Sequence, residues 1–246
     1  MNVLVCIDDT DNLESRGTGD LAEQLAGEVR ERSWGLCEFV TRHQLLLHPD
    51  VPYTSHNSSM CFAADIDAQH LPALIERAQK FLAEESAPGS DPGLAVAVPE
   101  SLRDATALIE FGRRAKQDVL SKQDAYSLAH DLGVHLSEHG GTGQGVIGAL
   151  AGTGLRLSGN DGRIKGWMDI PTSDGVAKVA DIVARFNLGG VRSMDGALLA
   201  ADDLIAVGEK PKAVFLGGKP FLMVSPLQQE GGVRWQTSSR RDLKQY

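Results

Sequence analysis

The sequence predicts an α+β fold, because strand-like and helix-like segments alternate along a chain long enough to bury a sizeable core. The chain has 246 residues, of which 42% are hydrophobic and 23% are charged, a composition typical of globular proteins. A polar stretch rich in Pro and Gly, EESAPGSDPG at residues 84–93, interrupts the alternation. This stretch predicts a connection between two domains.

The segment before this connection predicts a small mixed sheet with two helices packed on one face. Apolar runs predict strands at residues 2–7, 37–47 and 59–65. Leu21, Leu25 and Val29 recur at a spacing of four within residues 19–31, and a similar stripe covers residues 71–83, as in amphipathic helices. We therefore expect a first domain over residues 1–90.

The segment after the connection predicts a ferredoxin-like α+β domain over residues 91–200, built from two β-α-β-like halves. A capping-box-like pattern, Ser101-x-x-Asp104, predicts the start of its first helix. Short apolar runs further on predict a β-rich segment over residues 201–246. The remaining predicted elements are strands at 93–98, 134–139, 164–170 and 191–199, and helices at 122–132 and 174–186.

Composition limits the partners and the compartment of the protein. The net charge of −9 disfavours a large nucleic-acid footprint, which relies on clustered Lys and Arg. No segment approaches the roughly 20 apolar residues that span a bilayer, and no basic leader precedes the first strand. Three widely spaced cysteines without a CxxC motif predict reduced thiols. We expect a cytoplasmic protein without a membrane partner, for which a homo-oligomer is one candidate assembly.

Three aspartates directly follow the first predicted strand, in the sequence VLVCIDDTDN. Asp8, Asp9 and Asp11 would repel one another unless a cation lay between them. Mg²⁺ prefers oxygen ligands and commonly takes one or two carboxylates together with phosphate oxygens, so the cluster indicates a magnesium and phosphate site. The alternative is a solvated acidic turn, which Asn12 favours.

A Gly-Thr-Gly sequence stands one short loop after the aspartates, where the first helix begins. Gly17 and Gly19 would let a backbone approach a ligand, and a helix N-terminus offers free N–H groups to a phosphate. Thr18 either caps the helix or contacts, or accepts, a phosphoryl group. No Walker lysine is present, so the segment is not a P-loop.

A second polar stretch, at residues 42–60, connects two predicted strands and is dense in hydrogen-bonding side chains. Within it, Arg42, His56 and Asn57 are candidate cofactor-binding residues. The histidines of this stretch lack the spacing of a zinc site.

A third stretch, SEHGGTGQGVIGALAG at residues 137–152, places glycines ahead of a predicted helix. Gly141, Gly143 and Gly145 predict a nest of backbone N–H groups that holds phosphate. The glycine spacing does not fit a dinucleotide-binding fingerprint. The alternative is a flexible connection between a strand and a helix.

These three stretches, in this order, resemble the archaeal isoleucine-tRNA agmatinylcytidine synthetase family over roughly residues 1–160. IDDTDN…GTGD, LLLHPDVPYTSHNSS and GTGQGVIGALAGTG are each similar to a segment of that family. The resemblance implies a kinase-like domain that binds ATP and Mg²⁺, followed by a ferredoxin-like domain. In that family a tRNA cytidine is phosphorylated and agmatine then displaces the phosphate. By the same resemblance, Asp8, Asp9 and Asp11 would hold the metal and phosphates, and Thr18 matches the functional threonine.

The family also has an OB-fold and a zinc ribbon that hold tRNA, whereas this sequence contains no CxxC pair. Together with the net charge, this leads us to expect a nucleotide and an unknown small-molecule acceptor, and not tRNA. The sequence therefore predicts a Mg-ATP-dependent phosphotransferase or ligase-like enzyme.

Two alternatives stay open at this point. One is a non-catalytic protein that binds or senses a nucleotide or small ligand. The other is a haloacid-dehalogenase-like phosphatase, because Asp9-x-Asp11 follows an apolar strand; that chemistry forms an aspartyl-phosphate and needs a downstream lysine.

Overall fold

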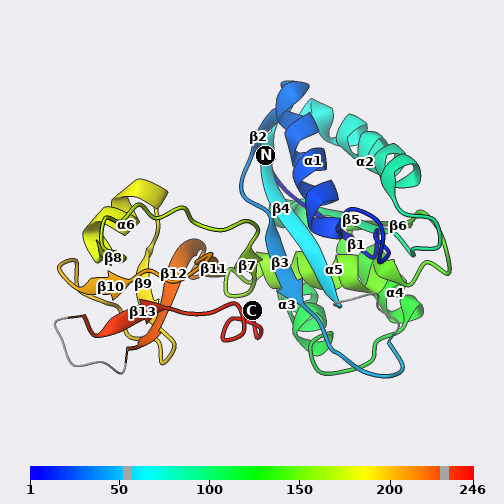
Figure 1. Cartoon of the computed structure of the whole chain (residues 1–246). Coiled ribbons are helices and arrows are strands. Elements are labelled where there is room, and N and C mark those ends of the chain that lie inside the picture. Colours follow the sequence, from blue (N-terminus) through cyan, green and yellow to red (C-terminus); the bar gives the residue numbers. More distant parts are fainter. Residues whose placement is uncertain (52–56, 228–232) are drawn as a thin grey trace. The chain divides into compact units, whose positions relative to one another are not determined.

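The computed structural model describes residues 1–51, 57–227 and 233–246. It divides the chain into two compact units, Met1–Ser158 and Gly159–Tyr246, whose elements are labelled in Figure 1. These are called the first and the second unit below. The division differs from the boundaries predicted near residues 90 and 200, because the strand that follows the Pro- and Gly-rich stretch joins the sheet of the first unit.

The first unit is built on an antiparallel sheet with strand order β6-β5-β1-β4-β3, and β2 also pairs with β4. The central strand β1 pairs with β4 on one side and β5 on the other, so Cys6 lies between Cys61 and Ala95. A strand enclosed on both sides is a rigid support for the residues at its end. The strands are β1 (Asn2–Asp8), β2 (Gly35–Cys37), β3 (Thr41–Gln44), β4 (Ser58–Ile66), β5 (Gly93–Ala97) and β6 (His135–Glu138).

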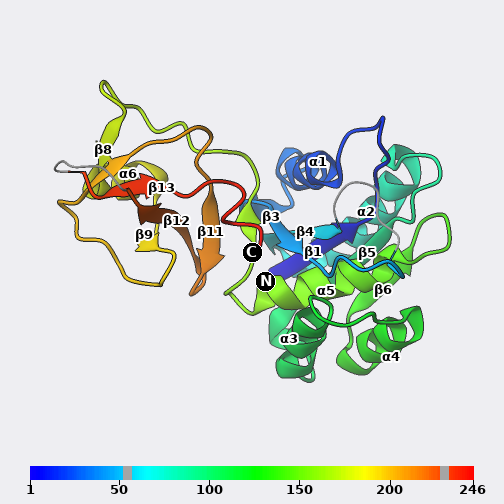
Figure 2. The ribbon, with the colours of Figure 1, turned by 60° about the horizontal axis from the view of Figure 1, so that its bottom comes forward.

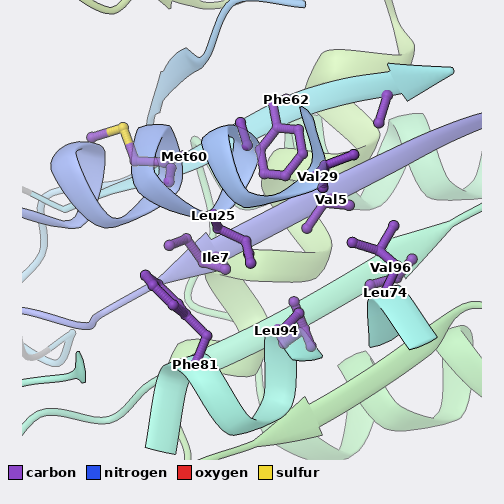
Figure 3. Packing of buried hydrophobic residues seen from close by; sticks show 14 of the residues in the cluster. Val5, Ile7, Leu25, Val29, Met60, Phe62, Leu74, Phe81, Leu94 and Val96 are labelled. Atoms are coloured by element: carbon purple, nitrogen blue, oxygen red, sulfur yellow. The ribbon is translucent and has the colours of Figure 1, made fainter. Parts of the chain in front are cut away.

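Helices α1 (Thr18–Glu31) and α2 (Leu71–Glu85) cover one face of this sheet (Figure 2). Alternate residues of β1, namely Val3, Val5 and Ile7, point to that face and are fully buried there. Figure 3 shows Val5 and Ile7 packed among side chains of both helices and of the neighbouring strands. The predicted stripes of the two helices are thus the core of this face.

The other face of the sheet is covered by α5 (Gly145–Leu157), with α3 (Ala105–Arg114) and α4 (Lys122–Leu132) outside it (Figure 2). Leu4 and Cys6 of β1 point to this face, because successive strand residues alternate between faces. Asp8, the next residue with this orientation, therefore points toward α5.

Helix α5 is buried along almost its whole length, and glycines allow its close approach to its neighbours. A Cβ atom on Gly152 would lie 2.6 Å from Sγ of Cys6, and one on Gly112 of α3 would lie 2.7 Å from the backbone oxygen of Ala151. Both distances are shorter than van der Waals contact, so any side chain at Gly152 or Gly112 would push α5 away from β1 or from α3.

The second unit is a mixed sheet with order β7-β11-β12-β13-β10-β8, and β9 pairs with β12 in parallel. Its core joins Val179 and Ile182 of the helix α6 to Val191, Ile205 and Leu222 of the strands. The elements are β7 (Arg163–Ile164), β8 (Val176–Lys178), α6 (Val179–Phe186), β9 (Gly190–Ser193), β10 (Leu204–Ala206), β11 (Ala213–Leu216), β12 (Lys219–Pro226) and β13 (Trp235–Thr237).

Several predicted elements differ in extent from those observed. Within the predicted strand 37–47, β2 ends at Cys37 and β3 covers only Thr41–Gln44; of the predicted strand 164–170, only Ile164 lies in a strand, β7. Residues 174–186 begin as β8 before they become α6, because Val176–Lys178 pairs with β10. Of the predicted strand 191–199, only the part in β9 forms.

The capping prediction for α3 is also corrected. Asp104, and not Ser101, is the N-cap residue, and its carboxylate accepts a hydrogen bond from the backbone N–H of Ala107 at 3.0 Å. Ser101 ends a short 3₁₀ helix, Pro99–Ser101; another, Ala68–His70, precedes α2. The sheets and helices are consistent with the predicted α+β class. Within the described ranges, no helix is long and apolar enough to cross a membrane.

Candidate functional site

A cleft of about 390 Å³ opens in the first unit at the end of β1. The end of the strand, the start of α1, the loops after β3 and α3, and the start of α5 all contribute to its walls. The residues that line it are Asp8, Asp9, Asp11, Thr18, Leu45, Leu46, Asp50, Val51, Asn57, Ser58, Ala115, Asp118, Val119, Leu120, Thr142, Gln144, Gly145, Ile147 and Gly148.

Asp8 is the buried carboxylate of the cleft. It is 8% exposed and faces Gly148 in the first turn of α5, where a Cβ atom would lie 2.6 Å from its Cγ. Burial raises its pKa to about 8, and repulsion from Asp9 and Asp11 adds to this shift. A nearby cation would favour loss of the proton from Asp8, because it would stabilise the carboxylate that burial and repulsion disfavour.

Asp9 has a left-handed backbone, with φ of 51°. This conformation is uncommon for a residue other than glycine and is concentrated at functional sites. It turns the chain out of β1 so that consecutive aspartates both reach the cleft. Burial raises the pKa of Asp9 to about 6, with further contributions from the carboxylates of Asp91 and Asp11.

Thr18 is buried beneath the third aspartate. Its hydroxyl donates a hydrogen bond to Oδ1 of Asp11 at 2.9 Å and accepts a longer one, at 3.5 Å, from the backbone N–H of Thr10. Gly17 is the N-cap residue of α1, so the alternative of Thr18 as an N-cap is wrong. The threonine instead fixes the position of the Asp11 carboxylate.

Part of the lining of the cleft, which we call the apolar wall, is formed by hydrophobic side chains that the sequence did not predict. The loop after β3 contributes Leu45, Leu46 and Val51, and the segment after α3 contributes Val119 and Leu120. An apolar wall facing a few polar groups is typical of a small-molecule site. Nothing in the local pattern of these residues separates them from core residues, so only the folded chain reveals them.

Two exposed carboxylates accompany the apolar wall, Asp50 and Asp118. Asn57 holds the same region in place, because its side-chain amide donates a hydrogen bond to the backbone oxygen of Leu46 at 2.6 Å. The cleft is therefore lined by carboxylates from several segments, which favours a cation or a cation-bound ligand.

The glycine-rich loop has the backbone of an anion-binding nest, with φ of 55° at Gly141 and 74° at Gly143. Its N–H groups, however, face a carboxylate of the same chain. The backbone N–H and the hydroxyl of Thr142 each donate to Asp91 at 2.5 Å. Only Gly145 of the three predicted glycines lines the cleft.

The structure brings six of the predicted site residues to the cleft and leaves others away from its walls. Arg42 lies on β3, where its Nε donates to the hydroxyl of Ser58 at 2.9 Å. Gly17 and Gly19 shape the start of α1 and do not line the cleft. His56 lies outside the described residues. The predicted residues at the cleft are Asp8, Asp9, Asp11, Thr18, Asn57 and Gly145.

No three His, Cys, Asp or Glu side chains converge as a metal site within residues 1–51, 57–227 and 233–246. Asp8, Asp9 and Asp11 therefore do not form a closed ligand set. They do fit Mg²⁺ bound partly by phosphate, since this ion usually takes only one or two carboxylates from the protein. The burial of Asp8 and its repulsion by the neighbouring carboxylates of Asp9 and Asp11 favour a cation at this site.

Comparisons with known proteins agree with the resemblance that the three motifs indicate. No protein-family model and no curated protein sequence matches the chain. Among solved structures it is similar to apo TiaS, the tRNAIle2 agmatidine synthetase, with 28% identity, a TM-score of 0.54 and coverage of 63% of this chain and 35% of the other. The chain is 28% identical to TiaS in its complex with tRNAIle2 and ATP, with a TM-score of 0.55 and coverage of 63% of this chain and 36% of the other. It is 27% identical to TiaS in the complex with tRNAIle2, AMPCPP and agmatine, with a TM-score of 0.53 and coverage of 62% of this chain and 36% of the other.

The resemblance to TiaS, identified from the aspartate and glycine motifs, is therefore confirmed. The chain spans about a third of the length of these structures. The similarity is therefore evidence for the fold of part of this chain and not by itself for an activity or a substrate.

Proposed function

We propose that the cleft of the first unit binds ATP with Mg²⁺ and that the protein is an ATP-dependent phosphotransferase or ligase-like enzyme. One observation carries the proposal: the end of β1 and the start of α1 place Asp8, Asp9, Asp11 and Thr18 in a single cleft. The solved structures similar to this chain include complexes with ATP and with AMPCPP. In this proposal, the kinase-like part is the whole first unit.

Each residue of the cleft has a distinct task. Asp8 and Asp9 would hold the cation, which when bound neutralises the phosphates and polarises their oxygens. Thr18 keeps Asp11 oriented through the 2.9 Å hydrogen bond. Phosphoryl transfer depends mainly on positioning and on charge neutralisation, so a rigid strand end with a fixed carboxylate suits it.

The apolar wall and its hydrogen-bonded backbone would receive the base or the acceptor. Leu45, Leu46 and Val51 contribute apolar side chains to the same cleft as the carboxylates. Burial of such a surface excludes water from the transferring group, which limits hydrolysis. The described lining of the cleft contains no lysine, so it lacks the cation that the phosphatase alternative needs.

The expectation that tRNA is not the acceptor finds no support in the comparisons, because two of the similar structures contain tRNA. The charge argument also applies unequally to the two units. The first unit has 23 Asp and Glu against 12 Lys and Arg, whereas the second has 10 against 12. We therefore propose a nucleotide acceptor, free or within an RNA.

Titration of Mg-ATP into metal-stripped protein by calorimetry, with a matched run lacking Mg²⁺, tests the proposal. We expect binding that depends on Mg²⁺ and is lost in Asp9→Asn. Asp67→Asn is the matched control, because Asp67 caps a 3₁₀ helix away from the cleft. Equal ATP affinity of wild type and Asp9→Asn would refute the proposed site.

A second measurement separates catalysis from binding alone. ATP labelled in the γ-phosphate is incubated with protein and with a nucleoside, a nucleoside monophosphate or bulk tRNA. Transfer of the label to one of these identifies the acceptor class. Binding without transfer to any of them would favour the sensor protein, and a stable beryllofluoride adduct at Asp9 would favour the phosphatase.

A further inference from the structure

The loop between β6 and α5, residues 139–144, is closed around one carboxylate. Asp91 lies in the Pro- and Gly-rich stretch just before β5, and its Oδ1 accepts the backbone N–H of Thr142 at 2.5 Å. Its Oδ2 accepts the hydroxyl of the same residue at 2.5 Å. The nearby backbone N–H groups of Gly143 and Gln144 further stabilise its negative charge. A carboxylate of the chain thus fills the nest that the glycine pattern predicts.

The same loop is held from its carbonyl side by Lys122, the first residue of α4. Nζ of Lys122 donates to the backbone oxygen of Thr142 at 2.7 Å and to Oε2 of Glu138 at 2.5 Å. Both the N–H and the C=O groups of the loop therefore have charged partners, which make stronger hydrogen bonds than neutral ones.

The glycines of the loop serve these contacts. A Cβ atom on Gly141 would lie 2.7 Å from Cγ of Asp91, and one on Gly143 would lie 2.6 Å from Cδ of Glu138. Both glycines also have positive φ, which favours residues without a side chain. The glycine spacing of the motif is explained by the internal carboxylates, without a bound phosphate.

The closed loop contacts the cleft directly. Thr142, Gln144 and Gly145 line the cleft, whereas Asp91 does not. Burial of Asp91 opposes its ionisation, but the hydrogen bonds from Thr142 and the nearby N–H groups of Gln144 and Gly143 outweigh burial and lower its pKa. Asp91 is therefore a fixed negative charge, and its field reaches Asp9.

We propose that Asp91 is a positioning residue of the nucleotide site, whose carboxylate permanently fills the nest and presents Thr142 and Gln144 to the cleft. The loop is then a rigid wall of the site and not an open phosphate cradle. This inference rests on the proposed binding of Mg-ATP in the cleft, but the state of the loop can be tested without nucleotide.

The test is rescue of Asp91→Ala by formate, which is small enough to replace the missing carboxylate. Without formate we expect the affinity for Mg-ATP to fall about tenfold or more, as when hydrogen bonds to a charged group are lost. Added formate restores affinity in Asp91→Ala and changes nothing in wild type. Asp104→Ala is the matched control: it removes a carboxylate that accepts a helix N–H but does not line the cleft, so its affinity stays unchanged with or without formate.

Amide hydrogen exchange at residues 142–144 of the ligand-free protein supplies the second readout. Exchange should accelerate in Asp91→Ala and slow again in formate, whatever happens with nucleotide. This result together with an absence of ATP binding in wild type would refute the proposed function and leave the closed loop intact. Tighter Mg-ATP binding by Asp91→Ala would overturn the inference, because Asp91 would then be a plug that competes with phosphate. Unchanged affinity would overturn it as well.

Discussion

Replacing Gly148 by alanine should damage the cleft and the stability of the first unit together. The new methyl group would lie 2.6 Å from Cγ of Asp8 and 3.1 Å from Cδ1 of Leu45, and Asp8 is too buried to move aside freely. Overpacking of this kind costs about 1–3 kcal/mol. The higher helix propensity of alanine returns about 1 kcal/mol. We expect a net loss of up to about 2 kcal/mol in the free energy of unfolding.

Gly27→Ala is the matched control, because it makes the same chemical change in a helix with open space around it. A Cβ atom on Gly27 in α1 has only the guanidinium of Arg30 within 4 Å, at 3.9 Å. This variant should gain about 0.5–1 kcal/mol from helix propensity alone.

Urea unfolding followed by circular dichroism measures the stability of both variants, and calorimetry with Mg-ATP measures the state of the cleft. Gly148→Ala should be the less stable of the two and should lose Mg-dependent nucleotide binding. If Gly148→Ala is as stable as Gly27→Ala and binds Mg-ATP like wild type, the contact between α5 and Asp8 does not have the close fit described above.

Three further outcomes are expected. The pKa of Asp8 is about 8 in the folded protein against an ordinary value of 3.8, so between these pH values the folded state binds one proton that the unfolded state does not. The free energy of unfolding of the metal-free protein should therefore fall as the pH rises from about 4 to 8. In Asp8→Asn, denaturation across this range should show a smaller dependence of stability on pH. Thr18→Val should lose about 1 kcal/mol and weaken Mg-ATP binding because Asp11 loses its donor, while Thr18→Ser should behave as wild type in the same titration. Arg77→Gln breaks a two-pronged pair with Glu28, at 2.5 and 2.7 Å, and should cost about 1–3 kcal/mol in thermal unfolding with nucleotide affinity unchanged; altered affinity would show that this pair supports the cleft.

Local patterns in the sequence predict the elements of the first unit well. The continuous apolar run of β1, which is buried on both faces of the sheet, and the apolar stripe of α1 are each contained in a short segment, so the local pattern identifies both. The cluster of three aspartates can also be predicted from a short segment, because a strand end followed by a short loop places them close together whatever packs around them. The sequence is thus sufficient to locate one side of the cleft.

The other side depends on contacts between distant segments. Asp91 was assigned to an interdomain connection, because nothing near it in the sequence shows that Thr142, 51 residues later, donates to both of its oxygens. The predicted domain boundary near residue 90 differs from the observed division into two units for the same reason. The stretch before β5 has the composition of a linker, and nothing in it shows that β5 pairs with β1.

The sequence by itself determined the fold class, the elements β1, α1 and α2, and the aspartate and Gly-Thr-Gly segments that resemble those of TiaS. Only the tertiary structure decided that Asp8 is buried against α5, that the glycine-rich loop encloses a carboxylate of its own chain, and that apolar side chains line the same cleft as the aspartates. The physical reason is that periodicity and turn chemistry are properties of neighbouring residues, whereas the charge state of a carboxylate and the occupant of a nest are set by whatever the rest of the chain brings within a few ångströms.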